Sequence, residues 1–382
     1  MRINELTYCD TINDWNLMPT KFKKDLTLLV GVSGVGKTRI LKAILSLREL
    51  INGKLPNGVK WSVNFTTIDG INYTWSGKTE VQSEHPSDFS SIFDIRLPML
   101  NKNSTNTIKE EFLYKGSDLV FSRNQDEIFF QDKTMPKLSA NESLISILKE
   151  EELIKTIYRD FSLILFEDLT KPIIGLSFIS KEEATQEYET IEELRQKKQD
   201  IISKIYLTSQ LFPEVFNDLK EQFIDIFPHV ENIRIHLTSY TEENESSITY
   251  IQIKEQGVSK WINQGRISSG MIRTFIHLAQ KKLCANGTIF LIDEFENSLG
   301  VNCLDQVTDE LLDEDRQVQY IVTSHHPYII NNINHENWLV VTRAKNKVQT
   351  ELAEKYIEAN SKHNYFMQLM QNSNYITGIT ES

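Results

Sequence analysis

An octapeptide near the N-terminus has the residue types and spacing of a phosphate-binding loop. Residues 31–38 read Gly-Val-Ser-Gly-Val-Gly-Lys-Thr and match the pattern G-x-x-x-x-G-K-[ST] in full. Glycines let backbone N–H groups approach phosphate oxygens, a lysine supplies positive charge to the β- and γ-phosphates, and a hydroxyl binds Mg²⁺. The sequence therefore predicts a nucleotide site, with Mg²⁺ bound by Thr38, formed by Gly31, Ser33, Gly34, Val35, Gly36, Lys37 and Thr38.

Two adjacent carboxylates follow an apolar run much later in the chain. Residues 288–294 read Thr-Ile-Phe-Leu-Ile-Asp-Glu, as expected for a buried strand that ends in acidic residues. Asp293 is predicted to hold the Mg²⁺ ion through its water shell, and Glu294 to orient and polarise an attacking water. A strand ending in Asp-Glu is often structural, but its occurrence downstream of a phosphate loop favours the functional interpretation.

Two further stretches carry groups that could reach a phosphate. Residues 323–327, Thr-Ser-His-His-Pro, follow the apolar run Tyr-Ile-Val, so a histidine there could donate a hydrogen bond to a γ-phosphate. Residues 267–274 read Ile-Ser-Ser-Gly-Met-Ile-Arg-Thr and are typical of a helix N-terminus that begins with small hydroxyl residues. Such an end suits an anion, which the other motifs suggest is the γ-phosphate of ATP.

Strands and helices are expected where these motifs need them. The run Leu-Thr-Leu-Leu-Val enters the phosphate loop and residues 38–53 have helical spacing, while residues 60–80 and 118–132 are typical of β hairpins. The pattern turns helical from about residue 139 to 227, notably over 142–161 and 182–206. Strands return over 232–240 and 246–257. The last third alternates strands with helices, including one helix over 302–315 and a small one over 353–370, which implies a largely parallel sheet.

As an ensemble, these motifs resemble ATP-binding-cassette (ABC) ATPases, specifically the soluble branch that includes RecF, Rad50, SMC and OLD-like proteins. The resemblance implies an α/β fold of the P-loop NTPase type, with a mixed β-sheet, an N-terminal antiparallel β subdomain and a helical lobe. It also implies three segments. Residues 1–135 carry the phosphate loop and the β subdomain, residues 136–228 form a helical insertion, and residues 229–382 carry the later motifs.

The resemblance assigns further roles to individual residues. Residues 267–271 stand where this branch has its serine-rich signature, a little over twenty residues before Asp293, so Ser268, Ser269 and Gly270 are expected to contact a γ-phosphate held by another subunit. His325 aligns with the family's switch histidine better than His326 does. Residues 297–300 correspond to a loop that meets the partner subunit. Candidates for a glutamine that links nucleotide and helical lobe are Gln125 and Gln131, and for an adenine-stacking aromatic Tyr8 and Trp15.

Composition limits the classes of protein that the chain can belong to. Its 382 residues can bury one large core or two moderate ones, and no window approaches the ~18 uninterrupted apolar residues of a membrane span. Three widely spaced cysteines show neither a disulfide framework nor a metal pattern. Together with the lack of a long apolar window, this predicts a cytoplasmic location without membrane contact. The formal charge of −12 argues against a surface that coats nucleic acid indiscriminately, but leaves room for a local basic groove.

Taken together, these features predict an Mg²⁺-dependent ATPase that binds two ATP molecules between two head-to-tail protomers, as a homodimer or a higher even-numbered homo-oligomer. Few residues follow the last expected strands, so no second catalytic domain is expected. Compact members of this kind occur in anti-phage systems such as Septu, PARIS and retron-associated ATPases. The leading hypothesis is a sensor or scaffold that controls a separately encoded effector, either a nuclease or a toxin. The alternative is a RecF-like repair protein that closes on DNA in an ATP-dependent manner.

Overall fold

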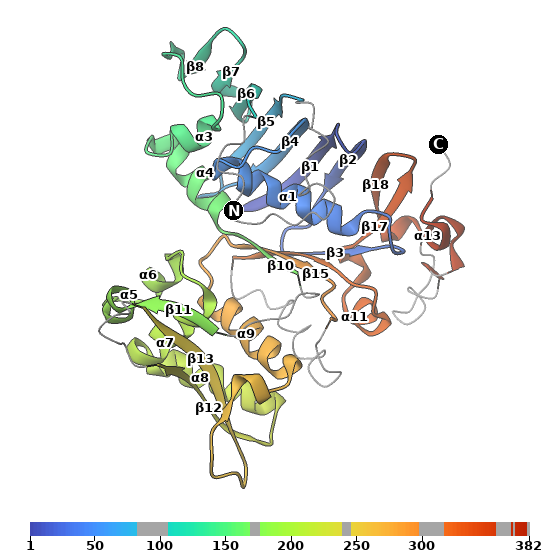
Figure 1. Cartoon of the computed structure of the whole chain (residues 1–382). Helices are drawn as coiled ribbons and strands as arrows, with labels where there is room; N and C mark the ends of the chain where they lie inside the picture. Colours follow the sequence, from blue (N-terminus) through green and yellow to red (C-terminus); the bar gives the residue numbers. More distant parts are fainter. Residues whose placement is uncertain are drawn as a thin grey trace, which may run out of the picture. The chain divides into compact units, whose positions relative to one another are not determined.

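The computed structural model describes residues 1–81, 106–168, 176–238, 246–297, 317–356, 368–369 and 371–379. These residues form two compact units that interleave along the chain (Figure 1). Unit 1 consists of Met1–Glu167, Gly287–Asp293 and Gln317–Ser382, and unit 2 of Asp168–Asn286 and Glu294–Arg316. Among the described residues, no helix is long and apolar enough to cross a membrane.

Unit 1 is built on a mixed sheet that contains fourteen strands among the described residues, in the order β10-β15-β16-β3-β17-β18-β2-β1-β4-β5-β6-β7-β8-β9. Strands β15, β16, β3 and β17 run parallel, whereas β1 and β4 to β9 form an antiparallel series. This confirms the predicted mixed α/β architecture with an N-terminal antiparallel part. The bounds are β1 Arg2–Asp10, β2 Trp15–Lys21, β3 Leu26–Val30, β4 Val59–Thr66, β5 Asn72–Thr79, β6 Ile108–Lys115, β7 Asp118–Arg123, β8 Ile128–Phe130, β9 Lys133–Thr134, β10 Ile164–Asp168, β15 Ile289–Asp293, β16 Gln319–Thr323, β17 Trp338–Ala344 and β18 Lys347–Leu352.

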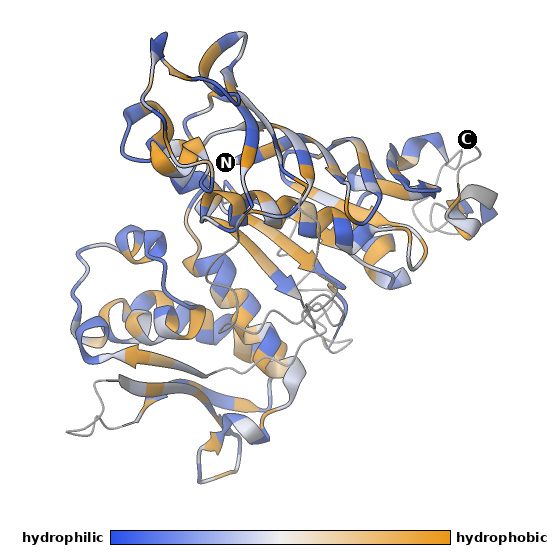
Figure 2. Cartoon of the chain, turned by 45° about the horizontal axis from the view of Figure 1, so that its top comes forward, coloured by the Kyte–Doolittle hydropathy of each residue, from blue (hydrophilic) through white to orange (hydrophobic). Residues whose placement is uncertain are grey.

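The parallel strands are buried on both faces, and most of their side chains are apolar. Every residue of β3, β15 and β16 is buried, and strands of the central sheet are largely orange, that is, hydrophobic, in Figure 2. Strand β4, by contrast, alternates buried with exposed or half-buried residues, as expected for a strand with one solvated face. The β4–β5 hairpin confirms the predicted pairing across the turn at residues 67–71.

Helix α1 (Lys37–Ile51) begins at the end of the phosphate loop and packs through one apolar face. Its buried apolar residues recur at helical spacing and belong to the same core cluster as residues of the parallel strands. The helix ends where predicted, at Asn52-Gly53, and Gly53 is left-handed with φ of 81°. The other helices among the described residues of unit 1 are α3 (Leu144–Ile147), α4 (Glu152–Ser162), α11 (Pro327–Asn332) and α13 (Ser373–Thr377).

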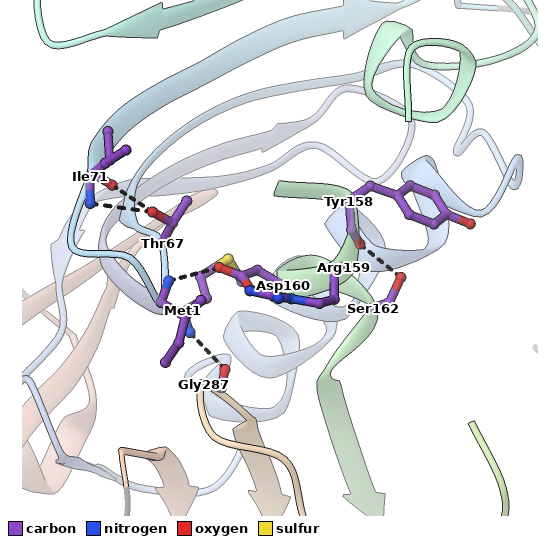
Figure 3. A network of polar contacts seen from close by, with 9 residues as sticks. Met1, Thr67, Ile71, Tyr158, Arg159, Asp160, Ser162 and Gly287 are labelled. Carbon is purple, nitrogen blue, oxygen red and sulfur yellow. Dashed lines mark hydrogen bonds and ion pairs between the residues drawn. The ribbon is translucent and has the colours of Figure 1, made fainter. Parts of the chain in front are cut away.

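A buried polar network holds the start of β15 against the N-terminal strands (Figure 3). The Met1 amine donates to the Gly287 carbonyl at 2.9 Å, two residues before β15 begins. The Asp160 carboxylate on α4 is fully buried, accepts from the Ile68 backbone N–H at 2.9 Å and pairs with Arg159 at 3.2 Å. The network thereby connects β1, the β4–β5 turn, α4 and the loop before β15.

Unit 2 contains a small antiparallel sheet and a group of helices. Strand β13 lies between β11 and β12 and also pairs with the short β14. Helix α7 contacts the sheet, and α7 and α8 both pack against α9. The bounds are β11 Leu176–Ser180, α5 Lys181–Thr185, α6 Ile191–Gln196, α7 Ile201–Leu211, α8 Pro213–Ile226, β12 Val230–Leu237, β13 Ser246–Glu255, β14 Ile262–Asn263 and α9 Ser269–Leu283, with a 3-10 turn at Gln264–Arg266.

The structure divides one predicted helical segment into shorter pieces. Residues 182–206 form α5, α6 and the start of α7, with non-helical residues at 186–190 and 197–200. The side chains of Thr190 and Asp200 each accept a backbone N–H three residues later, so each starts a new helix. The helix predicted over 302–315 lies outside the described residues, as does most of that predicted over 353–370.

The compact units also divide the chain differently from the three predicted segments, whose boundaries are 135/136 and 228/229. Strands β12 and β13 pair with β11, and this antiparallel pairing places them in one unit with the helices α5 to α8. Residues 136–167 instead lie in unit 1, where α4 contacts α1.

Glu111 on β6 offers a stability test within unit 1. Its carboxylate is fully buried and accepts from Trp75 Nε1 at 3.0 Å, Ser143 Oγ at 2.5 Å and the Leu144 N–H at 2.8 Å. Burial raises the pKa of this carboxyl despite these donors. We expect Glu111→Ala to lower the free energy of unfolding by about 3 kcal/mol in urea denaturation, because three buried donors lose their acceptor.

The neighbouring carboxylate provides the matched control. Glu110 forms an ion pair with Lys78 at 2.6 Å, but its side chain is 42% exposed. Glu110→Ala should therefore change the free energy of unfolding by less than about 0.5 kcal/mol. Equal losses in the two variants would contradict a structural role for the buried acceptor.

Candidate nucleotide-binding site

The site in unit 1 lies where parallel strands end at one edge of the sheet. Strands β15, β16 and β3 are neighbours and run in the same direction, so their carboxyl ends meet there. Asp293 is the last residue of β15, Thr323 is the last residue of β16, and the phosphate loop leaves β3 at Gly31. Segments that are almost 300 residues apart in the sequence, at 31 and 323, are thus brought together.

The phosphate loop adopts backbone geometry that requires glycine at two positions. A Cβ on Gly31 would lie 2.6 Å from the carbonyl oxygen of Val341, which is closer than any side chain can approach. Gly36 has φ of 115° and is the N-cap of α1, with no side chain over the first turn of the helix. The first backbone N–H groups of a helix have no partner within the helix, so this end suits a phosphate.

The lysine of the loop hydrogen-bonds to the loop's own backbone. The Lys37 ammonium donates to the carbonyls of Gly31 at 2.7 Å and Val32 at 3.1 Å and so lies back across the loop. Ser33 and Gly34 are exposed at the tip of the loop, whereas Val35 is buried. The seven predicted residues thus lie in one continuous segment that runs from Gly31, just after β3, to Lys37 and Thr38 in the first turn of α1.

The Asp293 carboxylate joins the strand ends through two hydroxyl groups. Its Oδ1 accepts from Thr38 Oγ1 at 3.1 Å and from Thr323 Oγ1 at 2.8 Å, and the side chain is nearly fully buried. Thr323 was not given a role from the sequence. The sequence feature that indicates such a role is a polar residue at the end of a buried apolar strand, in the stretch that also contains the candidate histidine.

Thr38 and Asp293 fit a magnesium ion that is bound mainly by its nucleotide. A hydroxyl and a carboxylate oxygen, both hard donors, lie 3.1 Å apart beside the phosphate loop. Magnesium is typically held by one or two protein oxygens, with phosphates and waters as its other ligands. No group of three histidine, cysteine or acidic side chains gathers in the part of the chain that the structure describes.

Glu294 follows Asp293 directly and has an unusual backbone. Its φ of 52° lies in the left-handed region, which costs free energy for a residue with a side chain. Asn297 stabilises this turn, because its Nδ2 donates to Glu294 Oε2 at 3.2 Å and its backbone N–H donates to the Glu294 carbonyl at 2.8 Å. The other residues of the predicted partner-contacting loop, 298–300, lie outside the described residues.

The two histidines after β16 differ in their surroundings. His325 is exposed beyond the end of the strand. His326 is half-buried at the N-cap of α11, its backbone N–H donates to Ser324 Oγ at 3.1 Å, and its Nδ1 has no hydrogen-bond partner among the described residues. The choice of His325 as the phosphate-contacting histidine stays a prediction, and the unpaired nitrogen makes His326 a second candidate.

The predicted serine-rich signature forms the N-terminus of α9 in unit 2. Ser268 is the N-cap, and its Oγ accepts from the Met271 N–H at 3.3 Å. Ser268 and Ser269 are exposed, and Gly270 is half-buried in the first turn. This helix end thus presents hydroxyl groups and a positive dipole to solvent, as the sequence predicted.

The C-terminal end of α9 is fixed by cations from the neighbouring helices. Arg195 Nε donates to the Lys282 carbonyl at 3.0 Å, and Lys204 Nζ donates to the Leu283 carbonyl at 3.5 Å and the Arg195 carbonyl at 2.7 Å. Burial lowers the pKa of Lys204 to about 8. Because carbonyls at a helix C-terminus lack partners within the helix, these donors stabilise that end of α9.

Two of the remaining candidates are restricted by burial. Tyr8 is 6% exposed and hydrogen-bonded to Ser46, and Trp15 is 3% exposed, so neither ring offers an open face for adenine. Gln125 and Gln131 are both exposed in the β7–β9 region, and the assignment of a nucleotide-linked glutamine to either stays a prediction.

Comparisons with known proteins give one family match and several similar solved structures. Residues 149–331 match the family described as AAA domain, putative AbiEii toxin, type IV TA system. No curated protein matches the sequence. Among solved structures, an SMC head bound to the C-winged helix domain of ScpA matches with TM-score 0.48 and 13% identity over 92% of this chain and 97% of that one. The SMC head domain from Thermotoga maritima matches with TM-score 0.42 and 10% identity over 94% and 100%.

The site and the family match define the class of protein. Strand β3 leads through the phosphate loop into α1, where Thr38 donates a hydrogen bond to the buried Asp293. Asp293 lies at the end of β15, two strands from β3 in the sheet. This is the arrangement of a P-loop nucleotide-binding domain. The matched family places an AAA-type ATPase domain in this chain. The match supports the predicted ATPase domain, and the assignment to the ABC-type branch with RecF, Rad50 and SMC rests on the motif resemblance.

His277 on α9 offers a test of pH dependence in unit 2. Its ring is buried against Phe295, with ring centroids 5.8 Å apart, and burial together with Lys281 lowers its pKa to about 4. The unfolded chain takes up a proton below about pH 6.5 that the folded chain does not, so stability falls as the pH is lowered. Between pH 7 and pH 5 we expect His277 to account for a loss of about 2 kcal/mol in the free energy of unfolding.

Denaturant titrations at both pH values check this expectation. His277→Leu should reduce the difference between pH 7 and pH 5, whereas His229→Leu, at a site where the side chain is 57% exposed, should leave it as in the wild type. An unchanged pH dependence in His277→Leu would show that this imidazole is not the group responsible.

Proposed function

We propose that the protein hydrolyses ATP and that its active site is completed by a second copy of the chain. The observation that carries this proposal is the junction of Thr38, Asp293 and Thr323 beside the phosphate loop. In the proposed reaction, a water oxygen attacks the γ-phosphorus, the bond to the bridging oxygen breaks, and ADP leaves with phosphate.

Each group of the site has a defined part in this reaction. Loop N–H groups and Lys37 bind the phosphates, and Glu294 orients the water and draws off its proton. Magnesium, held by Thr38 and Asp293, would neutralise charge that develops on the phosphates. His325 donates a hydrogen bond to the γ-phosphate oxygens.

The serine-rich end of α9 supports a composite site. Ser268, Ser269 and Gly270 lie at an open helix N-terminus that attracts anions, and they lie in unit 2 rather than in the unit that carries the phosphate loop. In the ABC-type branch, this signature contacts the γ-phosphate held by the other subunit. Two head-to-tail protomers would then enclose two ATP molecules, and nucleotide state would control dimer geometry.

Glu294→Gln should separate ATP binding from hydrolysis. The amide keeps the shape of the side chain but cannot accept the proton of the attacking water, so we expect turnover to fall at least about 100-fold. ATP should then hold the variant as a dimer, as measured by light scattering after size exclusion. Glu255→Gln, at the end of β13, is the control and should turn over ATP at the wild-type rate.

Complementation tests whether two chains share each site. Ser268→Arg blocks the signature, and Glu294→Gln blocks hydrolysis, so each variant alone should be nearly inactive. When the two variants are mixed in equal amounts before ATP is added, half of the dimers contain one chain of each kind. Each mixed dimer has one intact site of two, so the mixture should show about a quarter of wild-type activity. A mixture without recovered activity, or full activity in a monomeric Ser268→Arg sample, would contradict the composite site.

We further propose that the ATPase is the sensor or scaffold of an anti-phage system and controls a separately encoded nuclease or toxin. Support comes from the motif resemblance and from the matched family, whose description names a putative toxin of a toxin–antitoxin system. The solved SMC heads also include examples bound to parts of ScpA, a partner protein.

Expression from the native gene neighbourhood tests this role. The Glu294→Gln variant should retain a second protein on affinity purification, because its ATP-bound state is long-lived, and the wild-type locus should reduce plaque formation. No second protein and no plaque reduction would argue against the role. Stimulation of wild-type ATPase activity by duplex DNA, lost at high salt, would instead favour the RecF-like alternative.

A further inference from the structure

A segment from the C-terminal part of unit 1 lies directly on the phosphate loop. The segment comprises residues 373–379, that is, α13 followed by Gly378 and Ile379. A Cβ on Gly378 would lie 2.5 Å from Val35 Cγ1 and 2.6 Å from Val32 Cγ2. The backbone of Gly378 therefore packs against both valines of the loop, at a distance that admits no side chain.

The segment is anchored to the strand beside the loop. The Arg343 N–H on β17 donates to the Gly378 carbonyl at 2.7 Å, and Arg343 forms a parallel bridge with Ile379. Tyr375 on α13 is 6% exposed, and burial raises its pKa to about 12. Because α13 also contacts β17, the segment is held by backbone pairing and by packing.

Strand β17 thus supports the loop at two points. It pairs with β3 in parallel, and its Val341 carbonyl lies against Gly31, the first residue of the loop. Through Arg343 it also holds the segment that covers the two valines further along. The loop is consequently fixed at its beginning by β17 and in its middle by Gly378.

The side chains in the loop explain why such a cover is needed. The positions between the first glycine and Gly36 can take many residue types, and here two of them are valines. Val35 is 5% exposed and belongs to the core cluster, and Val32 packs against that cluster. Ordering a loop residue costs backbone entropy, so packing that orders the loop beforehand strengthens ligand binding.

We propose that residues 373–379 act as a clamp that holds the phosphate loop in the conformation that binds nucleotide, with Gly378 as a positioning residue. This inference rests on the proposed ATPase function. The clamp contacts Val32 and Val35 of the loop that binds the phosphates, and it is anchored to β17. A loosened clamp should therefore weaken nucleotide binding and leave the chemical step intact.

Gly378→Ala tests the clamp by adding one methyl group. The variant places a Cβ against Val32 and Val35, and we expect the KM for ATP and the Kd for a fluorescent ATP analogue to rise about tenfold, with kcat changed less than about twofold. Gly116→Ala is the matched control. Gly116 has φ of 59°, close to the 66° of Gly378, but has no atom within 4 Å of its Cβ position, so it reports backbone strain alone.

A second background identifies the contact responsible. In a chain that carries Val32→Ala and Val35→Ala, the methyl groups that would overlap with the new Cβ are gone. In that background, Gly378→Ala should raise the Kd for the ATP analogue by no more than Gly116→Ala does. Thermal unfolding without nucleotide, within a few degrees of wild type for each variant, shows that the fold is retained. If the unfolding temperature of Gly378→Ala falls further below that of the wild type, the Kd values are measured at a lower temperature. At that temperature Gly378→Ala must be folded both in the wild-type background and in the background with both valines replaced.

The outcomes separate this inference from the proposed function. Wild-type protein that binds no ATP, or Lys37→Ala that binds it equally well, would overturn the ATPase proposal. Lys37-dependent binding with equal Kd values for Gly378→Ala and Gly116→Ala would overturn the clamp alone. A fall in kcat at unchanged KM would also contradict it, because the segment would then act on hydrolysis rather than on binding.

Discussion

The carboxylate of Asp293 is the interaction on which the nucleotide site depends. It lies at the end of a buried strand and accepts hydrogen bonds from hydroxyls on α1 and β16, so it connects three segments that are distant in the sequence. A buried carboxylate is tolerated only when its oxygens are paired. The same pairing fixes the start of α1 relative to the strand ends, and with it the direction in which the phosphate loop presents its N–H groups.

Unit 2 uses a different device, a helix with one fixed end and one open end. The carbonyls at the C-terminus of α9 are held by Arg195 and Lys204, while Ser268 leaves the N-terminal dipole open to solvent. The body of α9 packs on Phe223 through Phe275, and His277 contacts Phe295. The serine-rich end and the turn that carries Glu294 thus belong to one packed unit, so a shift of α9 can be transmitted to that turn.

Local patterns predicted much of this structure, and long-range packing explains what they missed. The phosphate loop, α1 and the Asp293 strand follow from short motifs and apolar runs, because the residues that define them are contiguous. Thr323 and Gly378 could not be assigned, since their roles arise from contacts with Asp293 and Val35, far away in the sequence. The breaks within 182–206 depend on the capping side chains of Thr190 and Asp200, which helical periodicity does not reveal. The burial of Tyr8 and Trp15 likewise depends on the sheet around them.

The strand order of unit 1 has a consequence for how the chain folds on the ribosome. Strand β3 emerges early, but both of its neighbours, β16 and β17, belong to the last third of the sequence. The antiparallel series from β1 to β9 pairs largely between consecutive strands and can form while translation continues. The apolar β3 must therefore wait, without hydrogen-bonded neighbours, until more than 300 residues have been synthesised, and during that interval it is an unpaired apolar strand that a chaperone can protect from aggregation.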